Sequence, residues 1–354
     1  MPKFGDITNV WSTVRELNVG DIRDSANQPV SIAVIGAPEL RSAITQALYT
    51  GPSRYPAAQG VTINEYDVPV PRDRQSELSR ADLAILVLNS QRKIGADVIS
   101  AADKLSMLSC PRLLVLVDAE QLPTVEGDAT WYLAGMTQVF VPDTQPDTLA
   151  KQLVPVVVDS LPEDLRIAAA RKLPGLRDGV GRWLVGDVSF SNASFALTSG
   201  LPEMVPLLNI PLNAADMLVL TKNQALLVYK LALAFGAPPD FQAQMREVLP
   251  VIGSGFMWRQ AARQLVGLIP GFGILPKVAV AYAGTYATGQ AAVLWYRNGE
   301  RVSGDALSSL YKQAIEIGRQ RARELLQRRQ QQPPATGETR RMTPPARWWQ
   351  RFRR

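Results

Sequence analysis

Short continuous apolar runs alternate with stretches of helical spacing in the first half of the chain. Runs rich in aliphatic or β-branched residues predict strands over residues 30–35, 83–88, 113–117 and 138–141, and the alternation of apolar positions predicts another over residues 61–68. Residues 42–48 and 97–108 place their apolar positions three and four apart, which predicts helices between the strands. Strands that alternate with helices are typical of a mainly parallel sheet with helices on both faces. We therefore predict a three-layer α/β domain over residues 29–160.

The strand pattern stops after about residue 160 and gives way to helical spacing. Helices are predicted over residues 165–173, 178–197, 214–235, 242–249, 258–268, 278–296 and 306–327. Proline and glycine separate these stretches, as expected where helices end. The sequence therefore predicts an all-α helical domain over residues 161–328. Residues 7–17 also have helical spacing, so residues 1–28 form a predicted helical lead-in to the α/β domain.

The last segment, residues 329–354, is rich in Gln, Pro and Thr, which is typical of a disordered tail. Eleven arginines and two glutamates lie between residues 319 and 354, whereas the whole chain has a net charge of +6. The rest of the chain is therefore mildly acidic. The tail ends in a basic and aromatic sequence that supplies candidates for membrane contact, namely Arg347, Trp348, Trp349, Arg351 and Phe352.

Three interpretations of this basic-aromatic ending are open. Arginine beside tryptophan suits an anionic bilayer surface, where each basic residue contributes about 1 kcal/mol and the rings lie among the headgroups. The same residue types suit single-stranded nucleic acid. A solvated tail without a partner is the third interpretation. Because the rest of the chain is mildly acidic and has no nucleic-acid motif, we favour the membrane surface and do not expect nucleic acid as a partner.

The composition excludes several kinds of chemistry. The chain has no histidine, which removes the commonest general base, the Ser-His and Cys-His nucleophile pairs and the commonest metal ligand. Its single cysteine, Cys110, can form neither an internal disulfide nor a cysteine-rich zinc site, so we expect no metal centre. The first residues carry charges throughout and lack the apolar core of a signal peptide. We therefore expect the N-terminal domain to stay in the cytoplasm.

The residues after the first predicted strand stand where a P-loop, G-x-x-x-x-G-K-[ST], would lie. In that motif backbone N–H groups surround the phosphates, the lysine reaches the β- and γ-phosphates, and the hydroxyl binds magnesium. This chain has Gly36-Ala37-Pro38-Glu39-Leu40-Arg41-Ser42-Ala43. The motif can be aligned with this segment without a gap or with one residue deleted. With the deletion, Arg41 takes the lysine position and Ser42 keeps the hydroxyl. The second glycine of the motif is missing in both alignments. Glu39 adds a negative charge that opposes phosphate by about 1–4 kcal/mol.

The entry to this strand, with Asp21-Ile22-Arg23 and Pro29, resembles that of an Era-like small GTPase domain. The resemblance implies a D-x-x-G motif, and Asp67-Val68-Pro69-Val70 keeps the Asp but loses the Gly. It also implies a guanine-reading N-K-x-D motif, and Val117-Asp118-Ala119-Glu120 has neither the Asn nor the Lys. The residual nucleotide-binding candidates are Gly36, Arg41, Ser42, Asp67 and Asp118. We predict no catalytic residue and no cofactor, with GTP and magnesium as the alternative.

Residues 168–301 resemble the YcjF-like domain of unknown function that follows Era-like GTPase domains in bacteria. The resemblance rests on blocks such as Leu220-Thr221-Lys222-Asn223-Gln224, Trp258-Arg259-Gln260-Ala261-Ala262-Arg263 and Tyr282-Ala283-Gly284-Thr285-Tyr286-Ala287. It implies a mostly helical domain with membrane association. It implies no activity, because the family itself is uncharacterised.

Residues 278–296 form a run without charge that can be interpreted in two ways. A membrane span needs about 20 apolar residues, so the run is of marginal length. Trp295 and Tyr296 beside Arg297 are typical of an anchor at a membrane interface. Polar residues inside the run fit a buried core helix equally well. A second polar feature, Lys230 near the end of its predicted helix, complements the helix dipole, and we expect a structural role for it.

The leading hypothesis is a non-catalytic pseudo-GTPase that acts as a scaffold or regulatory protein. Its partners would be a membrane surface or membrane proteins, at the cytoplasmic face of the bacterial inner membrane. One alternative is an active or nucleotide-binding GTPase with atypical motifs, in which case the reaction would be GTP hydrolysis. The other alternative is a soluble protein-interaction module in the cytoplasm.

Overall fold

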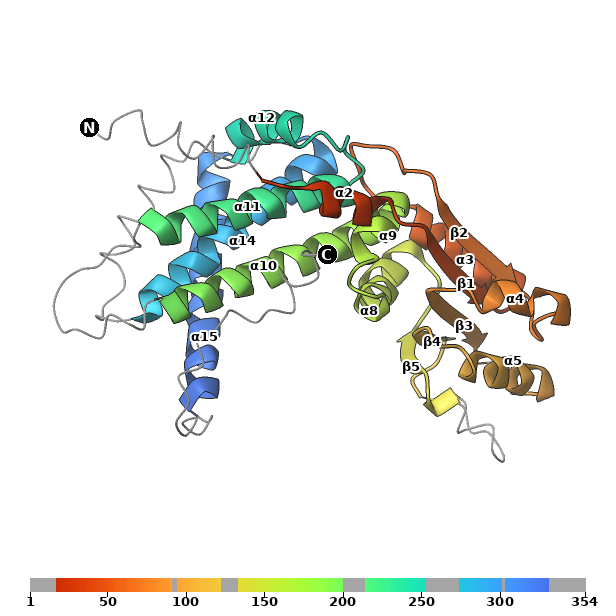
Figure 1. The fold of residues 1–354 in the computed structure, drawn as a ribbon. Helices are drawn as coiled ribbons and strands as arrows, with labels where there is room; N and C mark the ends of the chain where they lie inside the picture. The colour runs from red at the N-terminus through yellow and green to blue at the C-terminus, as the bar shows by residue number, and fades with distance from the viewer. Residues whose placement is uncertain are drawn as a thin grey trace, which may run out of the picture. The chain divides into compact units, whose positions relative to one another are not determined.

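The computed structural model describes residues 17–90, 94–121, 133–199, 214–252, 274–300 and 303–330. The predicted helix over residues 258–268, most of the lead-in helix and the basic-aromatic ending lie outside these ranges. The chain forms two compact units, coloured along the chain in Figure 1. The sheet unit consists of Arg23–Gly181 and Leu233–Ala237. The helical unit consists of Met1–Ile22, Arg182–Ala232 and Pro238–Arg354.

The sheet unit contains a five-stranded, fully parallel sheet. Its strands are β1 (Val30–Ile35), β2 (Val61–Tyr66), β3 (Leu83–Asn89), β4 (Arg112–Val117) and β5 (Thr137–Val141). Their order is β2-β1-β3-β4-β5, with β1 paired to both β2 and β3. This is a doubly wound order, whose direction reverses between β1 and β3. The α/β prediction is confirmed, and the continuous apolar runs form the central strands β1, β3 and β4, which are buried on both faces.

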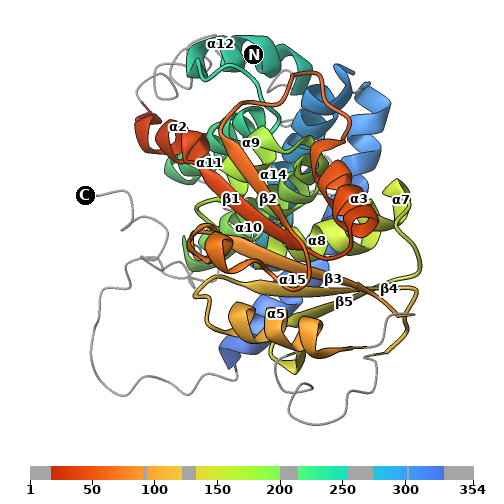
Figure 2. The ribbon, with the colours of Figure 1, turned by 90° about the vertical axis from the view of Figure 1, so that its right-hand side faces the viewer.

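Helices cover both faces of this sheet. The helical segments before the helical unit are α2 (Gly20–Asn27), α3 (Pro38–Tyr49), η1 (Arg72–Arg74), α4 (Gln75–Leu78), α5 (Ala96–Ser106), α7 (Pro146–Thr148), η2 (Leu149–Leu153), α8 (Val154–Ser160), α9 (Arg166–Lys172) and η3 (Pro174–Leu176). Figure 2 shows α3 and α8 on one side of the sheet and α5 on the other. On the α5 side, apolar residues of β1, β3 and β4 form one core with α4 and α5. On the opposite side, α3 contributes Ile44 and Leu48, which are fully buried.

The helical unit confirms the prediction of an all-α region. It is built from α10 (Arg177–Ser199), α11 (Ala214–Ala234), α12 (Phe241–Ile252), α14 (Ile274–Asn298) and α15 (Gly304–Gln330), and the first turn of α10 and the end of α11 fall in the sheet unit. Helix α14 is central, since no residue from Val278 to Arg297 is exposed. The core interpretation of residues 278–296 therefore describes the structure. Within the described ranges, no helix combines the length and the apolar character needed to cross a membrane.

The sheet unit includes three helical segments that follow residue 160 in the chain. Helix α9, η3 and the first turn of α10 belong to the sheet unit. The reason is a group of buried cations that donate to backbone carbonyls of that unit. Arg166 donates to the carbonyl oxygens of Asp159 and Leu161, and Lys172 donates to that of Gln28.

Arg177 makes the most extensive of these contacts and is fully buried. Its Nε donates to the Ala170 carbonyl at 3.1 Å, and its Nη1 donates to the Tyr55 carbonyl at 2.7 Å. Its Nη2 donates to the carbonyls of Pro56 at 3.0 Å and Arg171 at 3.2 Å. Burial and the nearby Arg171 lower the pKa of Arg177 to about 10. One guanidinium thus ties the segment between α3 and β2 to α9.

Arg171 extends the same pattern to residues that come much later in the chain. Its Nη1 donates to the carbonyls of Leu233, at 3.2 Å, and Ala237, at 2.8 Å. The Ser53 hydroxyl donates to the Phe235 carbonyl at 3.2 Å. Because carbonyls at a helix C-terminus lack partners within the helix, cations and hydroxyls are their natural donors. These bonds explain why residues 233–237 belong to the sheet unit.

Candidate functional site

The connection between β1 and α3 is too short to form a phosphate-binding loop. Strand β1 ends at Ile35 and α3 begins at Pro38, so the connection is only Gly36 and Ala37. The Arg41 N–H already donates to the Ala37 carbonyl at 3.0 Å, as in a regular helix. Helix α3 begins four residues earlier than predicted, and it absorbs the positions that would surround a phosphate in a P-loop.

The start of α3 is also a poor anion site. A helix N-terminus attracts anions through its exposed N–H groups and its dipole. Here Pro38 has no N–H, and Glu39 places a carboxylate in the first turn. No side chain caps this end of the helix. Both residues favour the start of a helix, and both weaken the attraction for a phosphate.

Gly36 is needed for packing against the neighbouring strand. A Cβ atom at this position would lie 2.6 Å from both the carbonyl oxygen and Cγ1 of Val87 in β3. The Gly36 N–H donates to the Tyr66 carbonyl at 3.1 Å. The absence of a side chain therefore lets β1 continue past β3 without a clash, independently of any ligand.

Arg41, the candidate for the lysine role, is held by acidic residues of β2 and the turn after it. Its Nη1 donates to the Gly36 carbonyl at 3.0 Å and to the Asp67 carboxylate. Its Nε lies 3.4 Å from a carboxylate oxygen of Glu65, and only 13% of the Arg41 side chain is exposed. The Thr45 hydroxyl donates to the second oxygen of Glu65 at 2.7 Å. The charge that would attract phosphate is thus neutralised within the protein.

The structure brings together three of the five nucleotide-binding candidates. Gly36, Arg41 and Asp67 contact one another, but the contact is an internal ion pair. Ser42 is exposed on α3. Asp118 lies after β4, two strands away from β1 in the sheet order. Glu65 and Thr45 were not singled out from the sequence, although Glu65 stands two residues before Asp67.

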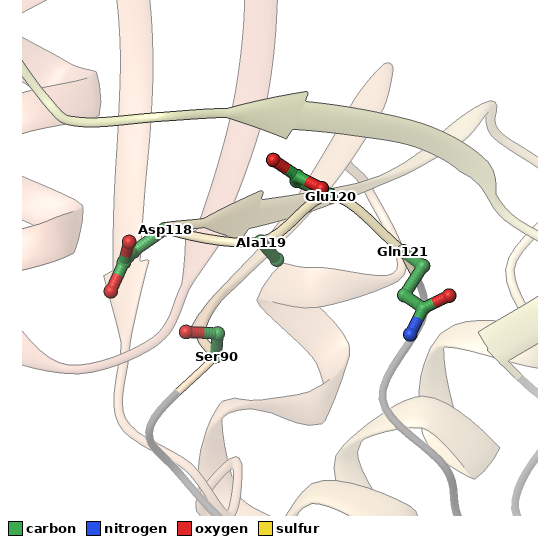
Figure 3. Close-up of a pocket in the computed structure, with 5 residues that line it drawn as sticks. All are labelled: Ser90, Asp118, Ala119, Glu120 and Gln121. Atoms are coloured by element: carbon green, nitrogen blue, oxygen red, sulfur yellow. The ribbon is translucent and has the colours of Figure 1, made fainter.

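A separate hollow lies at the carboxyl ends of β3 and β4 (Figure 3). Its volume is about 480 Å³, and it is lined by Ser90, Asp118, Ala119, Glu120 and Gln121. The Asp118 N–H donates to the Val141 carbonyl at 2.8 Å, and Asp118 has a positive φ of 56°. Figure 3 shows the carboxylates of Asp118 and Glu120 apart from each other, on either side of Ala119. The hollow offers acceptors and negative charge, which suit N–H donors and oppose phosphate.

Ser90 and Gln121 are lining residues that sequence reasoning missed. Each follows closely after the end of a parallel strand, which is where ligands of doubly wound sheets bind. Position after a strand was therefore the only available signal. Within the described ranges, no three acidic or cysteine side chains converge as a metal site would require.

The structure places two of the membrane-contact candidates in a core. Trp295 is 8% exposed and Tyr296 is fully buried. The Tyr296 hydroxyl contacts Oε1 of Gln244 in α12 at 3.1 Å. Arg297 is partly exposed. The candidates in the tail, from Arg347 to Phe352, lie outside the described residues.

Polar side chains join three helices inside the helical unit. Asn192 of α10 donates to the Thr285 hydroxyl of α14 at 2.8 Å and accepts from Asn223 of α11 at 2.6 Å. Both Asn192 and Thr285 are fully buried. Nearby in sequence, Lys230 is also buried, and burial lowers its pKa to about 8, while Asp187 acts in the opposite direction. The expected structural role of Lys230 thus includes a buried charge.

A comparison of the sequence with protein-family models finds no match, and a comparison with curated proteins finds none either.

Proposed function

We propose that this chain is a non-catalytic pseudo-GTPase that acts as a scaffold or regulatory protein. The observation that carries the proposal is the occupied phosphate position. Helix α3 begins two residues after β1, and Arg41 is bound to Asp67 and Glu65. The carboxyl end of β1, where a doubly wound sheet would bind phosphate, is therefore blocked. The surface of the sheet unit can still contact other proteins.

The charge at the second half of the ligand edge supports the same conclusion. The hollow after β4 has Asp118 and Glu120 where a guanine-reading N-K-x-D motif would place Lys and Asp. A nucleotide there would bring its phosphates toward Glu39 and Asp67. At a few ångströms, each like-charge pair costs about 1–4 kcal/mol near a protein surface.

The rival function is a nucleotide-binding GTPase that uses Arg41, Ser42 and Asp67. Its specific support is that Arg41 and Asp67 do lie at the carboxyl ends of β1 and β2, where phosphate and magnesium ligands belong in such a fold. For this rival, nucleotide would have to release Arg41 from two carboxylates and refold the start of α3.

The test is thermal denaturation of the full-length chain with GTP, GDP or ATP, each with and without magnesium. A nucleotide present at a hundred times its Kd would stabilise the protein by about 2.7 kcal/mol. We expect no stabilisation by any nucleotide. A magnesium-dependent stabilisation by GTP that disappears in Arg41→Ala but persists in the surface variant Arg80→Ala would refute the proposal and support the rival.

We further propose that the protein associates with the cytoplasmic face of a bacterial inner membrane through its basic tail. The support is the clustering of arginine and aromatic residues after residue 346. Flotation with anionic vesicles should require residues 331–354, and neutral vesicles should not bind. Flotation of the truncated chain would instead assign binding to the helical unit. No flotation at all would leave the alternative of an interaction module without membrane contact.

A further inference from the structure

Among the residues that the structure describes, strand β2 forms one edge of the sheet and pairs only with β1 (Figure 2). Its residues are Val61-Thr62-Ile63-Asn64-Glu65-Tyr66. Natural proteins blunt such edges with proline, outward-facing charge, a bulge or a covering element, because an open edge pairs with another strand. Strand β2 has no proline. Its single charge, Glu65, is held by Arg41 and Thr45.

The hydrogen bonds fix which backbone groups of β2 face outward. The Gly36 N–H donates to the Tyr66 carbonyl, so the backbone of Tyr66 faces β1. Because successive residues of a strand direct their N–H and C=O groups to opposite edges, Val61, Ile63 and Glu65 face away from β1. Nη1 of Arg74 donates to the Glu65 carbonyl at 2.8 Å from the outer side, which agrees with this assignment.

Most outward groups of β2 have no partner within the described part of the chain. They are the N–H and C=O of Ile63, the N–H and C=O of Val61 and the N–H of Glu65. Backbone N–H donors and C=O acceptors therefore alternate along this edge, as in any strand that can pair with another strand. Thr62 is exposed, and the side chains of Val61 and Ile63 are only partly buried.

We propose that this edge pairs with the β2 edge of a second copy of the chain, antiparallel and with its two-fold axis at Ile63. In that register Ile63 lies opposite Ile63 of the second copy, so their N–H and C=O groups exchange two hydrogen bonds. Val61 of one copy and Glu65 of the other also lie opposite each other and exchange two hydrogen bonds. The Glu65 carbonyl would then accept from the Val61 N–H as well as from Arg74, which its two lone pairs allow. This proposal does not depend on the pseudo-GTPase proposal.

The side-chain chemistry favours a second copy as the occupant. On one face of the joined sheets, Thr62 would lie opposite Asn64, and two uncharged polar residues tolerate this pairing. On the other face, the apolar Ile63 pair is flanked by Val61 opposite Glu65. No like charges stand directly opposite each other, which would otherwise be destabilising. The isologous contact closes after two copies, as two-fold interfaces do.

The first measurement is the mass of the full-length chain by light scattering over a wide range of concentration. We expect a transition from 38.7 kDa to twice that mass. Ile63→Lys should remain monomeric, because it places two ammonium groups opposite each other, and so should Ile63→Glu. An equal mixture of the two variants should recover the dimer. This recovery separates loss of pairing from loss of folding, because misfolded chains would not regain it.

A cross-link tests the register. In a Cys110→Ser background, which removes the only native cysteine, Ile63→Cys should form a disulfide-linked dimer on mild oxidation. Opposed residues of a hydrogen-bonded pair lie about 5.5 Å apart at Cα, within the range for a disulfide. Thr62→Cys is the matched control, since its copy would lie about 7–8 Å away on the diagonal and should not cross-link.

Two results would overturn the proposal. One is a chain that stays at 38.7 kDa at every concentration, which would leave the edge to a strand from a different protein. The other is a dimer that survives both Ile63→Lys and Ile63→Glu, which would place the interface elsewhere.

Discussion

Replacing Arg177 with methionine should detach the segment between α3 and β2 from α9. The methionine keeps much of the buried apolar volume but removes every donor of the guanidinium. The carbonyls of Tyr55, Pro56, Ala170 and Arg171 then lose a partner. A buried acceptor left without a donor costs about 1–3 kcal/mol.

The four losses do not simply add. The carbonyls of Tyr55 and Pro56 lie in a partly buried setting, so water can replace the guanidinium there. The Arg171 carbonyl keeps its bond from the Ala58 N–H at 3.1 Å. The variant also avoids the cost of burying a cation, a cost visible in the lowered pKa of Arg177. We therefore expect a net loss of about 3–4 kcal/mol for Arg177→Met, within the upper range for single substitutions.

Lysine at this position should recover only part of the loss. Its ammonium has three donors at one point, whereas the planar guanidinium spans acceptors on two separate segments. We expect Arg177→Lys to lose about 2 kcal/mol. Arg80→Met is the matched control, because Arg80 is exposed and its side chain should contribute less than about 0.5 kcal/mol.

The assay combines chemical denaturation with hydrogen exchange followed by mass spectrometry. Exchange should accelerate most in peptides covering residues 50–60 and α9, and much less in the central strand β3. A loss of less than about 1 kcal/mol for Arg177→Met, or uniform acceleration across the sheet unit, would refute the reasoning. The first result would mean that water replaces the guanidinium everywhere, and the second that the contact has no local role.

Three further predictions concern the helical unit. The pKa of Lys230 is about 8 in the folded chain and 10.5 in the unfolded chain, so the unfolded chain binds more protons between these pH values. The free energy of unfolding should therefore rise with pH across this window by on the order of 2–3 kcal/mol. Urea unfolding should show this rise in the wild type but not in Lys230→Met. Gly318→Ala should lower the free energy of unfolding by about 1–3 kcal/mol, and with it the melting temperature, since the added Cβ would lie 2.8 Å from the Ala279 carbonyl oxygen. Gly186→Ala, which also lies within a helix but meets nothing within 4 Å, should instead stabilise by about 0.5–1 kcal/mol.

The central strands β1, β3 and β4 were predictable from sequence because each is buried on both faces and forms one continuous apolar run. The edge strand β2 was predictable from the alternation of its apolar positions. The start of α3 was placed wrongly, although its local signals were present. Pro38 and Glu39 are typical of the first turn of a helix. The expectation of a phosphate loop at this point outweighed them. Where a motif matches only in part, the helix-start signals within it therefore predict the local structure better than the residues that still match.

The membership of α9 and η3 in the sheet unit and the burial of Trp295 could not be predicted in the same way. A change from strand to helix patterns at residue 160 reports local structure, whereas membership of a unit depends on distant contacts. Arginine and lysine are almost never fully buried, so nothing in the sequence marks Arg177 as a core residue. Trp295 beside Arg297 matches an interfacial pattern, but packing of α14 within its unit decides where the ring lies.

The interrupted course of the sheet unit also has a consequence for synthesis on the ribosome. The unit needs residues 233–237, whose carbonyl oxygens accept hydrogen bonds from Arg171 and Ser53. At about 5–20 residues per second, translation from the end of β5 to Ala237 takes roughly 5–20 s. During this interval the complete sheet has emerged, yet the buried Arg171 at the end of α9 and the Ser53 hydroxyl lack these acceptors. A nascent chain would therefore expose apolar surface for seconds. This is long enough for chaperones to bind before residues 233–237 complete the sheet unit.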